Sequence, residues 1–323
     1  MILALIDHDR GSLNTVSLEM LTLGRQLAND TDSTLAAILI GDTALPLIEQ
    51  LATYGVATAY HVEHENLDDY APQAWAQSVL QLIETAAPEA VLAPGTDRGY
   101  EVLAHVAALL DLPLAANCTA VIPGDDYQVM RLRWGGSLLE EAVLKGSPKL
   151  LAIAPHAIAA EEGGDVKEPV VTVFIPTLTK KEFRVRVTGR EPSDSQGISL
   201  TDARVVVGGG RGVGSREGFD VLDELAALLD GAVGGSRVAT NLGWRPHADQ
   251  IGQTGIRIAP DLYIACGISG AIQHWVGCKG AKQFLAINTD AEAPMVTKAD
   301  YAVIGDLHEL IPALITEIQK LKE

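Results

Sequence analysis

A glycine-rich segment is the strongest sign of chemistry in this 323-residue sequence. Residues 205–214 read VVVGGGRGVG, an apolar run that leads into five glycines and one arginine, Arg211. Glycine has no Cβ to keep a backbone away from a phosphate, and the free N–H groups at the start of a following helix attract anions. Arg211 would add a fixed positive charge and a planar fork of donors. The segment therefore predicts a site for a phosphorylated ligand, with a tight structural turn as the alternative.

The segment lacks the strict form of either common phosphate motif. Ser215 stands where a dinucleotide fingerprint has its last glycine, and the Lys-Ser or Lys-Thr pair of a P-loop is absent. The ligand class is indicated instead by five later loops with the same polar and flexible character. These loops are residues 234–237 (GGSR), 250–255 (QIGQTG), 266–274 (CGISGAIQH), 288–290 (NTD) and 305–306 (GD). Six such loops in one unit predict an extended nucleotide cofactor.

Groups for other chemistry are missing from these loops. They contain no Ser-His-Asp order, paired carboxylates or metal-type cluster, so the site has no obvious acid or base of its own. Taken alone, His274 is explained equally well as a hydrogen-bonded core residue. The metal-like cluster around His61 and His64 is explained equally well by solvated charges at a strand end. The three cysteines form no CxxC pair, which indicates a reducing, cytoplasmic compartment.

Parallel strands would place these loops together. Val-, Ile- and Leu-rich runs alternate with amphipathic segments along the chain, which is typical of an α/β fold with a mostly parallel sheet. Loops at the carboxyl ends of such strands meet at one edge, where open α/β sheets bind ligands. We predict two domains, residues 1–187 and 203–323, each a mostly parallel β-sheet flanked by helices. A turn-rich linker at 188–202 joins them, and the second is a doubly wound cofactor domain.

The expected elements follow from this alternation. In the first domain we expect strands at 2–6, 34–40, 57–62 and 90–93 and helices at 17–28, 44–54, 72–86 and 100–110. After residue 115 no long helix intervenes, so we expect antiparallel additions at 119–122, 128–134, 142–145, 150–154 and 170–174. In the second domain we expect strands at 204–207, 237–239, 262–265, 284–287 and 301–304 and helices at 217–229 and 307–321.

The charge balance limits the partners of the protein. Lys and Arg number 24 against 42 Asp and Glu, for a formal net charge of −18. Nucleic acid and anionic lipid select basic surfaces, so neither is expected as a partner. No uncharged apolar stretch reaches the roughly 18 residues of a membrane span, so no direct membrane insertion is expected. The second domain is nearer to neutral, with 11 basic and 15 acidic side chains in residues 201–323, and can hold a phosphorylated cofactor.

Together the loop motifs resemble a known family, the alpha subunit of electron transfer flavoproteins. GGRG, GSR and GQTG are followed by APDLYIACGISGAIQH, AIN and ADY. The resemblance covers the whole chain, and in the first domain it is one of pattern, notably LAPGTDRGYE at 92–101. It implies a heterodimer with a beta subunit, an FAD in the C-terminal domain, and a redox carrier rather than an enzyme. Electrons would pass from flavoprotein dehydrogenases to a quinone reductase or another acceptor.

The resemblance also implies which residues contact the FAD. Arg237 would lie close to the isoalloxazine ring, Thr254 near N5, and His274 near O2. A guanidinium and an imidazole there would stabilise the negative charge that grows on reduction. The full set of implied contacts is Arg211, Ser236, Arg237, Ile251, Gly252, Gln253, Thr254, Ser269, Gly270, Ala271, Ile272, Gln273, His274, Asn288, Asp306 and Leu307.

Two other functions remain open at this point. A bifurcating electron transfer flavoprotein would carry a second FAD in the beta subunit in place of AMP and would take electrons from NADH. The site that decides this lies in the other chain. An NAD-dependent oxidoreductase with a similar nucleotide-binding fold would need a catalytic acid, base or nucleophile, and the loops above provide none.

Overall fold

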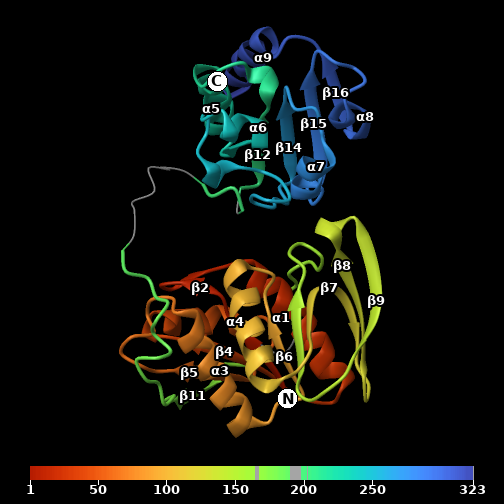
Figure 1. Cartoon of the computed structure of the whole chain (residues 1–323). Helices are drawn as coiled ribbons and strands as arrows, with labels where there is room; N and C mark the ends of the chain where they lie inside the picture. Colours follow the sequence, from red (N-terminus) through yellow and green to blue (C-terminus); the bar gives the residue numbers. More distant parts are fainter. Residues whose placement is uncertain (164–166, 190–197, 202, 323) are drawn as a thin grey trace. The chain divides into compact units, whose positions relative to one another are not determined.

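The computed structural model describes residues 1–163, 167–189, 198–201 and 203–322, and its fold is α/β as predicted. The chain divides into two compact units, Met1–Glu191 and Pro192–Glu323. Most of the expected linker falls on residues 190–197 and 202, which lie outside the described residues. Each unit has its own sheet and its own helices (Figure 1).

In the described part of the first unit, nine strands form one sheet in the order β11–β5–β4–β1–β6–β10–β7–β8–β9. The strands from β11 to β7 pair in parallel, whereas β8 pairs antiparallel with both β7 and β9. The bounds are β1 (Ile2–Leu5), β4 (Leu35–Ile40), β5 (Thr58–Val62), β6 (Ala90–Ala93), β7 (Leu114–Ile122), β8 (Tyr127–Arg133), β9 (Leu138–Leu144), β10 (Lys149–Ile153) and β11 (Val170–Phe174). A small hairpin of β2 (His8–Asp9) and β3 (Ser12–Leu13) follows β1.

Helices cover both faces of this sheet because its central strands are apolar on both sides. β1 and β4 are buried along their whole length. One face packs against α1 (Val16–Asp30), the 3₁₀ helix η1 (Asp42–Leu47) and α2 (Ile48–Ala52). The other face packs against α3 (Pro72–Ala86) and α4 (Asp97–Leu110). The predicted alternation of strands and helices is confirmed for these elements.

Two strands were wrongly expected to be antiparallel additions. β10 lies between β6 and β7 and pairs in parallel with both, and β11 pairs in parallel with β5. Antiparallel pairing was expected because no long helix separates these strands from the strands before them. Here the chain reaches β10 through β7, β8 and β9, so strands rather than a helix form the crossover. All five residues of β10 are buried, as is typical of a central parallel strand.

The described strands of the second unit form a wholly parallel sheet in the order β13–β12–β14–β15–β16. Their bounds are β12 (Val205–Gly209), β13 (Ala232–Gly235), β14 (Leu262–Cys266), β15 (Gln283–Asn288) and β16 (Tyr301–Ile304). One face packs against α5 (Asp220–Leu228) and α9 (Leu307–Lys322), and the other against α7 (Ile272–Cys278) and α8 (Pro294–Lys298) (Figure 1). Along the chain this order is 2-1-3-4-5, which confirms the doubly wound architecture.

The second strand of this sheet was expected too late in the chain. Residues 237–239 belong to the short helix α6 (Arg237–Asn241), and the strand β13 ends at Gly235. Ser236 caps the helix, because its Oγ accepts a hydrogen bond from Ala239 N at 3.4 Å. The helix expected at 217–229 begins with the 3₁₀ turn η4 (Glu217–Phe219) before α5. The polar residues after β13 therefore start a helix at the end of the strand.

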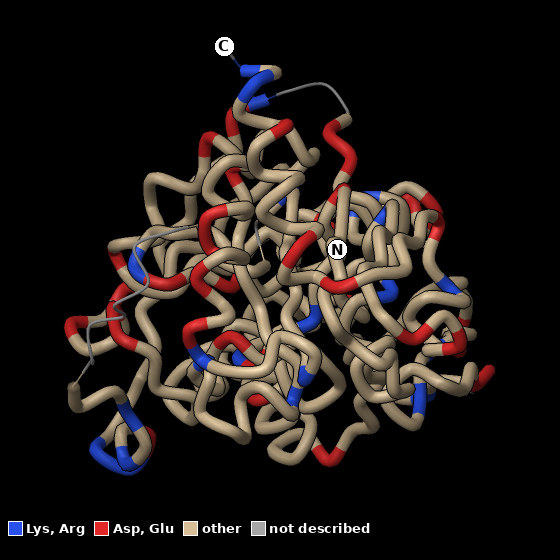
Figure 2. Tube along the Cα trace, turned by 90° about the horizontal axis from the view of Figure 1, so that it is seen from above, with Lys and Arg blue, Asp and Glu red and all other residues tan. Residues whose placement is uncertain are grey.

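Acidic residues, red in Figure 2, occur in many separate parts of the described trace, and in the sequence they outnumber the basic ones. The longest described helix, α9, has 16 residues and ends in charged side chains. None of the helices in the described ranges combines the length and the apolar character that crossing a bilayer requires.

Candidate functional site

The residues predicted to bind a cofactor lie at one edge of the second unit's sheet. Because the five strands run parallel, their carboxyl ends share this edge. The predicted residues that follow the strands are Arg211 after β12, Ser236 and Arg237 after β13, 269–274 after β14, Asn288 at the end of β15, and Asp306 and Leu307 after β16. The loop 251–254 joins them, since Ile251 N donates to Gly235 O at 2.9 Å. The strand order thus brings distant motifs together.

Two glycine loops meet where the strand order reverses, between β12 and β14. Gly210 N donates to Cys266 O at 2.9 Å, and Gly212 N donates to Gly267 O at 3.0 Å. A Cβ on Gly212 would lie 2.7 Å from Gly267 Cα, so the two loops pack backbone against backbone. Gly267 has a φ of 62°, a left-handed conformation that glycine adopts without strain. Doubly wound sheets bind their ligands at such a reversal point.

Two of the five glycines in 205–214 make room for aromatic rings rather than for a phosphate. Gly208 and Gly209 are the last residues of β12, and both are buried. A Cβ on Gly208 would overlap the Tyr263 hydroxyl, and a Cβ on Gly209 would overlap the Phe219 ring. The strand end therefore needs glycine on both faces. Gly210 and Gly212 make room for the backbone at Gly267, so of the five glycines only Gly214 has open space at its Cβ position.

The 250–255 loop is hydrogen-bonded to the segment that follows β14. Gln253 N donates to Gln273 O at 2.8 Å. Helix α7 packs on the first of these loops through a pair of glycines, because a Cβ on Gly277 would overlap Gly252 N. The predicted segments 251–254 and 269–274 therefore form one continuous part of the edge.

The buried side-chain amide of Gln250 makes a hydrogen bond to the hydroxyl of Thr254. Gln250 donates from Nε2 to Thr254 Oγ1 at 2.9 Å, and its Oε1 accepts from Thr240 Oγ1 at 3.0 Å. Because Thr254 Oγ1 accepts this hydrogen bond, its own O–H is left to donate elsewhere. Thr254 is exposed, so this proton can be donated to water or to a ligand. The three residues thus fix the direction of one hydroxyl at the edge.

His274 is a buried polar group of the edge. The residue is 7% exposed, and its Nε2 lies 2.8 Å from the Tyr263 hydroxyl. Its Nδ1 makes no hydrogen bond of normal geometry within the described residues, although the main chain of Ile251 is near enough to act on the ring. Burial lowers the pKa of His274 to about 4, and a main-chain interaction with Ile251 opposes this shift in part. The imidazole is therefore neutral at pH 7.

Two arginines at the edge are left without partners. Arg211 and Arg237 are exposed, and neither guanidinium makes an ion pair or hydrogen bond with another residue that the structure describes. By contrast, Arg204 at the amino end of β12 is bound to Asp261 Oδ2 at 2.7 Å. A guanidinium without a partner beside glycine loops suits a phosphate or another anion.

The remaining predicted residues have internal roles. Asn288 Nδ2 donates to Ile268 O at 3.0 Å and so ties β15 to the loop after β14. Asp306 Oδ1 accepts from His308 N at 2.9 Å, at the start of α9. Leu307 is buried in the core beneath α9, so its side chain is not available to a ligand. These three residues shape the edge.

Three residues of the edge were missed from the sequence: Thr240, Gln250 and Tyr263. Tyr263 lies in an apolar strand, and a buried tyrosine hydroxyl needs a polar partner, which is the signal that the sequence offered. Gln250 lies in the predicted loop 250–255 but was not among the predicted contacts, and Thr240 gave no signal. The paths of the loop and of α6 decide which way these two side chains point.

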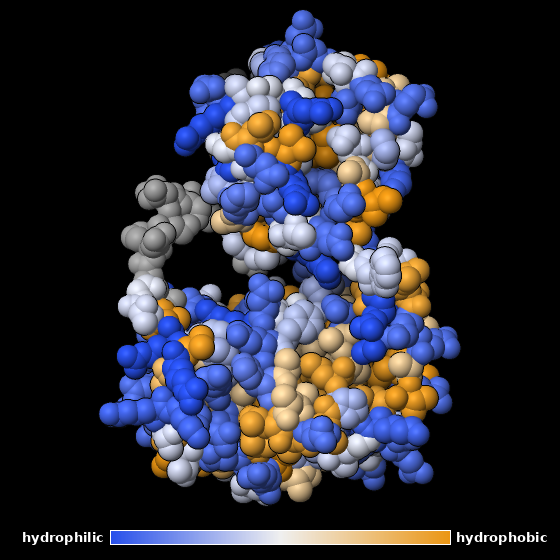
Figure 3. All heavy atoms as spheres, in the orientation of Figure 1, coloured by the Kyte–Doolittle hydropathy of each residue, from blue (hydrophilic) through white to orange (hydrophobic). Residues whose placement is uncertain are grey.

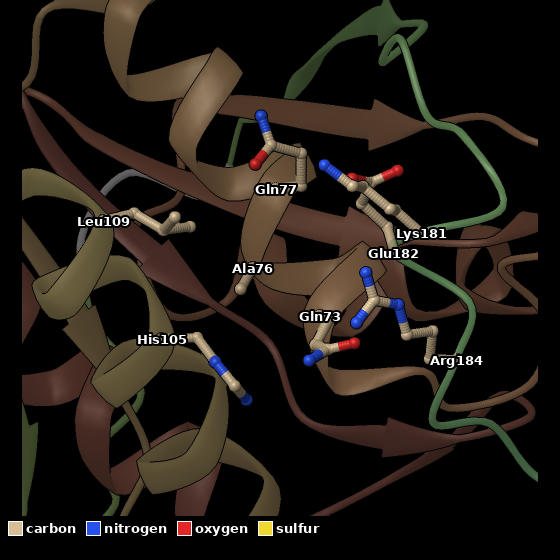
Figure 4. Close-up of a pocket in the computed structure, with 8 residues that line it drawn as sticks. All are labelled: Gln73, Ala76, Gln77, His105, Leu109, Lys181, Glu182 and Arg184. Carbon is tan, nitrogen blue, oxygen red and sulfur yellow. The ribbon is translucent and has the colours of Figure 1, made fainter.

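The first unit has a hollow of about 260 Å³ between α3, α4 and the segment around residue 182 (Figure 4). It is lined by Gln73, Ala76, Gln77, His105, Leu109, Lys181, Glu182 and Arg184, which include none of the predicted cofactor residues. In the same unit His61 Nε2 lies 3.1 Å from Asp42 Oδ1, and the described residues bring no three metal-type side chains together. The candidate site therefore stays at the sheet edge of the second unit.

The chemistry of this edge fits an extended phosphorylated cofactor such as FAD. Arg211 and Arg237 offer positive charge without a protein partner. His274 offers a buried ring nitrogen without a partner. Glycines at the reversal point let the loops after β12 and β14 pack closely at the place where doubly wound sheets bind ligands.

Comparison with known proteins gives the same answer for both units. Residues 2–177 match the electron transfer flavoprotein domain, and residues 199–279 match the electron transfer flavoprotein FAD-binding domain. Electron transfer flavoprotein alpha subunits are 33% identical over 321 residues in Thermoanaerobacterium thermosaccharolyticum, 37% over 324 in Mycobacterium leprae and 34% over 313 in Bacillus subtilis. These alignments cover 98%, 99% and 96% of this chain and 97%, 98% and 95% of the relatives. The chain therefore belongs to the electron transfer flavoprotein family, as an alpha subunit that carries the family's FAD-binding domain.

Proposed function

We propose that this chain forms a heterodimer with an electron transfer flavoprotein beta subunit and acts in the cytoplasm as a redox carrier rather than as an enzyme. It would accept electrons from flavoprotein dehydrogenases and pass them to a quinone reductase or another acceptor. The observation that carries this proposal is the gathering of donors without partners at Arg211, Arg237 and His274 on one sheet edge. Such donors favour a ligand whose negative charge changes.

The bound FAD would supply reversible one-electron transfer, and the residues of the edge would hold it and set its potential. Arg211 would pair with the pyrophosphate. Arg237 would place its charge beside the ring, Thr254 would donate its O–H toward N5, and His274 would face O2. The proposed contacts are Arg211, Ser236, Arg237, Ile251, Gly252, Gln253, Thr254, Ser269, Gly270, Ala271, Ile272, Gln273, His274, Asn288, Asp306 and the main chain at Leu307.

The beta subunit would dock on the antiparallel part of the first unit. Large apolar side chains are exposed on β7, on β9 and in the turn between β8 and β9 (Figure 3). They are Ile122, Leu139 and Val143, which the register places on one face of the sheet, and Trp134 in the turn, with Trp134 82% and Leu139 64% exposed. We call these four residues the apolar patch. An exposed patch of this kind is typical of a protein–protein interface, and the acidic surface argues against nucleic acid as a partner.

The experiment is co-expression of this chain with its beta subunit, followed by a visible spectrum and a flavin count. We expect flavin absorption that dithionite bleaches in two one-electron steps. A colourless heterodimer that binds NAD would contradict the proposal and favour an NAD-dependent oxidoreductase. Two flavins per heterodimer, together with reduction by NADH, would identify the bifurcating type instead.

A further inference from the structure

A tyrosine lies directly behind His274. Tyr263 on β14 has no exposed surface, and among the described residues its hydroxyl has one polar partner, His274 Nε2 at 2.8 Å. The two rings are stacked, with centroids 6.1 Å apart and an interplanar angle of 29°. Tyr263 belongs to the hydrophobic core cluster on this face of the sheet. A polar pair in such surroundings contributes free energy only if its hydrogen bonds are satisfied.

The hydrogen bond between these rings has two possible directions, and they differ in cost. If Tyr263 donates to Nε2, both of these atoms are satisfied, and the imidazole proton lies on Nδ1. If Nε2 donates to Tyr263, the phenol proton has no acceptor within the described residues, and Nδ1 is a bare acceptor as well. The first direction leaves one unsatisfied group and the second leaves two. Each buried unsatisfied group costs free energy, so the first direction is favoured.

We propose that Tyr263 is a positioning residue that donates to His274 Nε2 and so holds the imidazole as the neutral tautomer with its proton on Nδ1. The Nδ1–H group is then a fixed donor at the edge. The identity of its acceptor as the FAD rests on the proposed function, whereas the tautomer itself does not. In the proposed FAD site, Arg237 would then supply a positive charge, and His274 would supply a hydrogen bond from a neutral ring.

The sequence contains the conditions for this arrangement. Gly208 leaves the space that the phenol occupies, since a Cβ there would overlap the Tyr263 hydroxyl. His274 is held in the first turn of α7, where its main-chain N donates to Ala271 O at 2.9 Å. Burial also lowers the pKa of His274 to about 4, which agrees with a neutral ring. The His274 imidazole, its partner Tyr263 and the first turn of α7 are therefore in place without a ligand.

The test is ¹⁵N NMR of the heterodimer labelled at histidine, with and without its flavin. A protonated and an unprotonated ring nitrogen have well separated ¹⁵N shifts, so the tautomer is read directly. We expect His274 at pH 7 to carry its proton on Nδ1, with Nε2 unprotonated. A proton on Nε2, or on both nitrogens, in the wild-type protein would overturn the proposal.

The variant is Tyr263→Phe, which removes the donor and keeps the ring. We expect the single tautomer signature of His274 to be replaced by a mixture or by the Nε2–H form. The matched control is Tyr301→Phe, because Tyr301 is 60% exposed on β16, and it should leave the signature unchanged. An unchanged tautomer in Tyr263→Phe would overturn the proposal. If that variant does not fold, the wild-type measurement still decides.

The same samples separate this inference from the proposed function. A wild-type heterodimer without flavin absorption would contradict the proposed function, and the tautomer could still be read on the flavin-free protein. A flavin-loaded wild type with the proton of His274 on Nε2 would leave the proposed function intact and overturn the role of Tyr263.

Discussion

Arg237 begins α6 with an exposed guanidinium that has no partner among the described residues, so its charge is available to a ligand. We expect Arg237→Ala to lower the first midpoint potential of the bound flavin, because the reduced and more negative form loses a nearby positive charge. A charge-assisted interaction of about 1.5–3 kcal/mol corresponds to roughly 60–130 mV for one electron. Spectroelectrochemistry of the heterodimer measures this shift.

The control for this charge is Arg204→Ala. Arg204 is also an exposed arginine of the second unit, but it lies at the amino end of β12 and is bound to Asp261. Removal of the Arg204 side chain should leave the first midpoint potential of the flavin unchanged. Equal shifts in the two variants would contradict a local role for Arg237 and indicate a general effect of net charge.

Gln250 is expected to control the direction of the Thr254 hydroxyl. In Gln250→Glu a carboxylate replaces the amide that donates to Thr254 Oγ1, so Thr254 would turn its proton inward to the new acceptor. The loss of one hydrogen bond to the ligand should weaken FAD binding about tenfold, or about 1.4 kcal/mol. Titration of FAD into the flavin-free heterodimer measures this change. Gln283→Glu, at the exposed amino end of β15, is the control, and equal affinity in wild type and Gln250→Glu would refute the expectation.

His274 also predicts a pH dependence of stability. Its pKa is about 4 in the folded protein and 6.5 in the ordinary case, so between these values the unfolded chain binds a proton that the folded chain does not. Stability must therefore fall as the pH falls through this window, by about 2 kcal/mol between pH 7 and pH 5. Urea unfolding of the flavin-free protein at both values measures this loss.

The matched variant for this pH effect is His274→Gln. Burial lowers the pKa of His8 in the first unit too, so the wild-type slope contains a second contribution with the same sign. His274→Gln should remove its own part of the loss and keep that of His8. A slope identical to wild type would show that His274 titrates normally.

Many residues of the site could be predicted from their types alone. The roles of the others depend on which way their side chains point in the folded protein. Arg211, Arg237 and Thr254 could be predicted because glycine, arginine and hydroxyl residues cluster after apolar runs. The role of Gly208 could not, since the same residue type serves a phosphate or an aromatic ring equally well. Here Gly208 makes room for the ring of Tyr263. That contact arises because β12 pairs with β14 in the sheet, which the local sequence does not reveal.

At the scale of elements, α7 and the 250–255 loop depend on glycine at their contact. An alanine in a helix ordinarily stabilises by about 0.5–1 kcal/mol over glycine. Gly277→Ala should reverse this sign, because its Cβ would overlap Gly252 N and force the loop away from the helix. We expect a loss of about 1–3 kcal/mol in the free energy of unfolding and weaker FAD binding. Denaturant unfolding and FAD titration of the same variant measure both.

The control for this contact is Gly189→Ala, since a Cβ at Gly189 would meet no atom within 4 Å. It should leave stability and FAD affinity close to wild type. A stabilised Gly277→Ala with normal FAD affinity would show that the loop and the helix are not locked together.

The elements that sequence patterns predict well are those whose connection is a helix. β1, β4, β5 and β6 alternate with helices, and their parallel pairing followed from that alternation. β10 returns to the centre of the sheet after two antiparallel strands, and local sequence contains no information about which neighbour a strand will find. The error at 237–239 is of a different kind, because Ser236 could be recognised as a helix cap that follows two glycines.

At the scale of the whole molecule, the acidic excess and the apolar patch belong to the same unit. Residues 1–200, which include all of the first unit, carry 13 basic and 27 acidic side chains, and the patch on β7, on β9 and in the turn before β9 lies within them. Like charges keep such proteins apart at a distance, whereas an apolar surface binds a partner of matching shape at contact. In the proposed heterodimer, the acidic excess would keep copies of the first unit apart until the beta subunit covers the patch.

The apolar patch gives the last prediction, a loss of the heterodimer in Leu139→Asp. Leu139 is 64% exposed on β9, so the substitution should leave the fold of the first unit unchanged. In a covered interface the new carboxylate would lose its hydration and find no partner, which costs several kcal/mol. Size-exclusion chromatography of the co-expressed subunits should then show two separate species instead of one. Leu321→Asp, at a leucine 87% exposed at the end of α9, introduces the same charge and should leave the heterodimer intact. A heterodimer that survives Leu139→Asp would place the docking surface elsewhere on the chain.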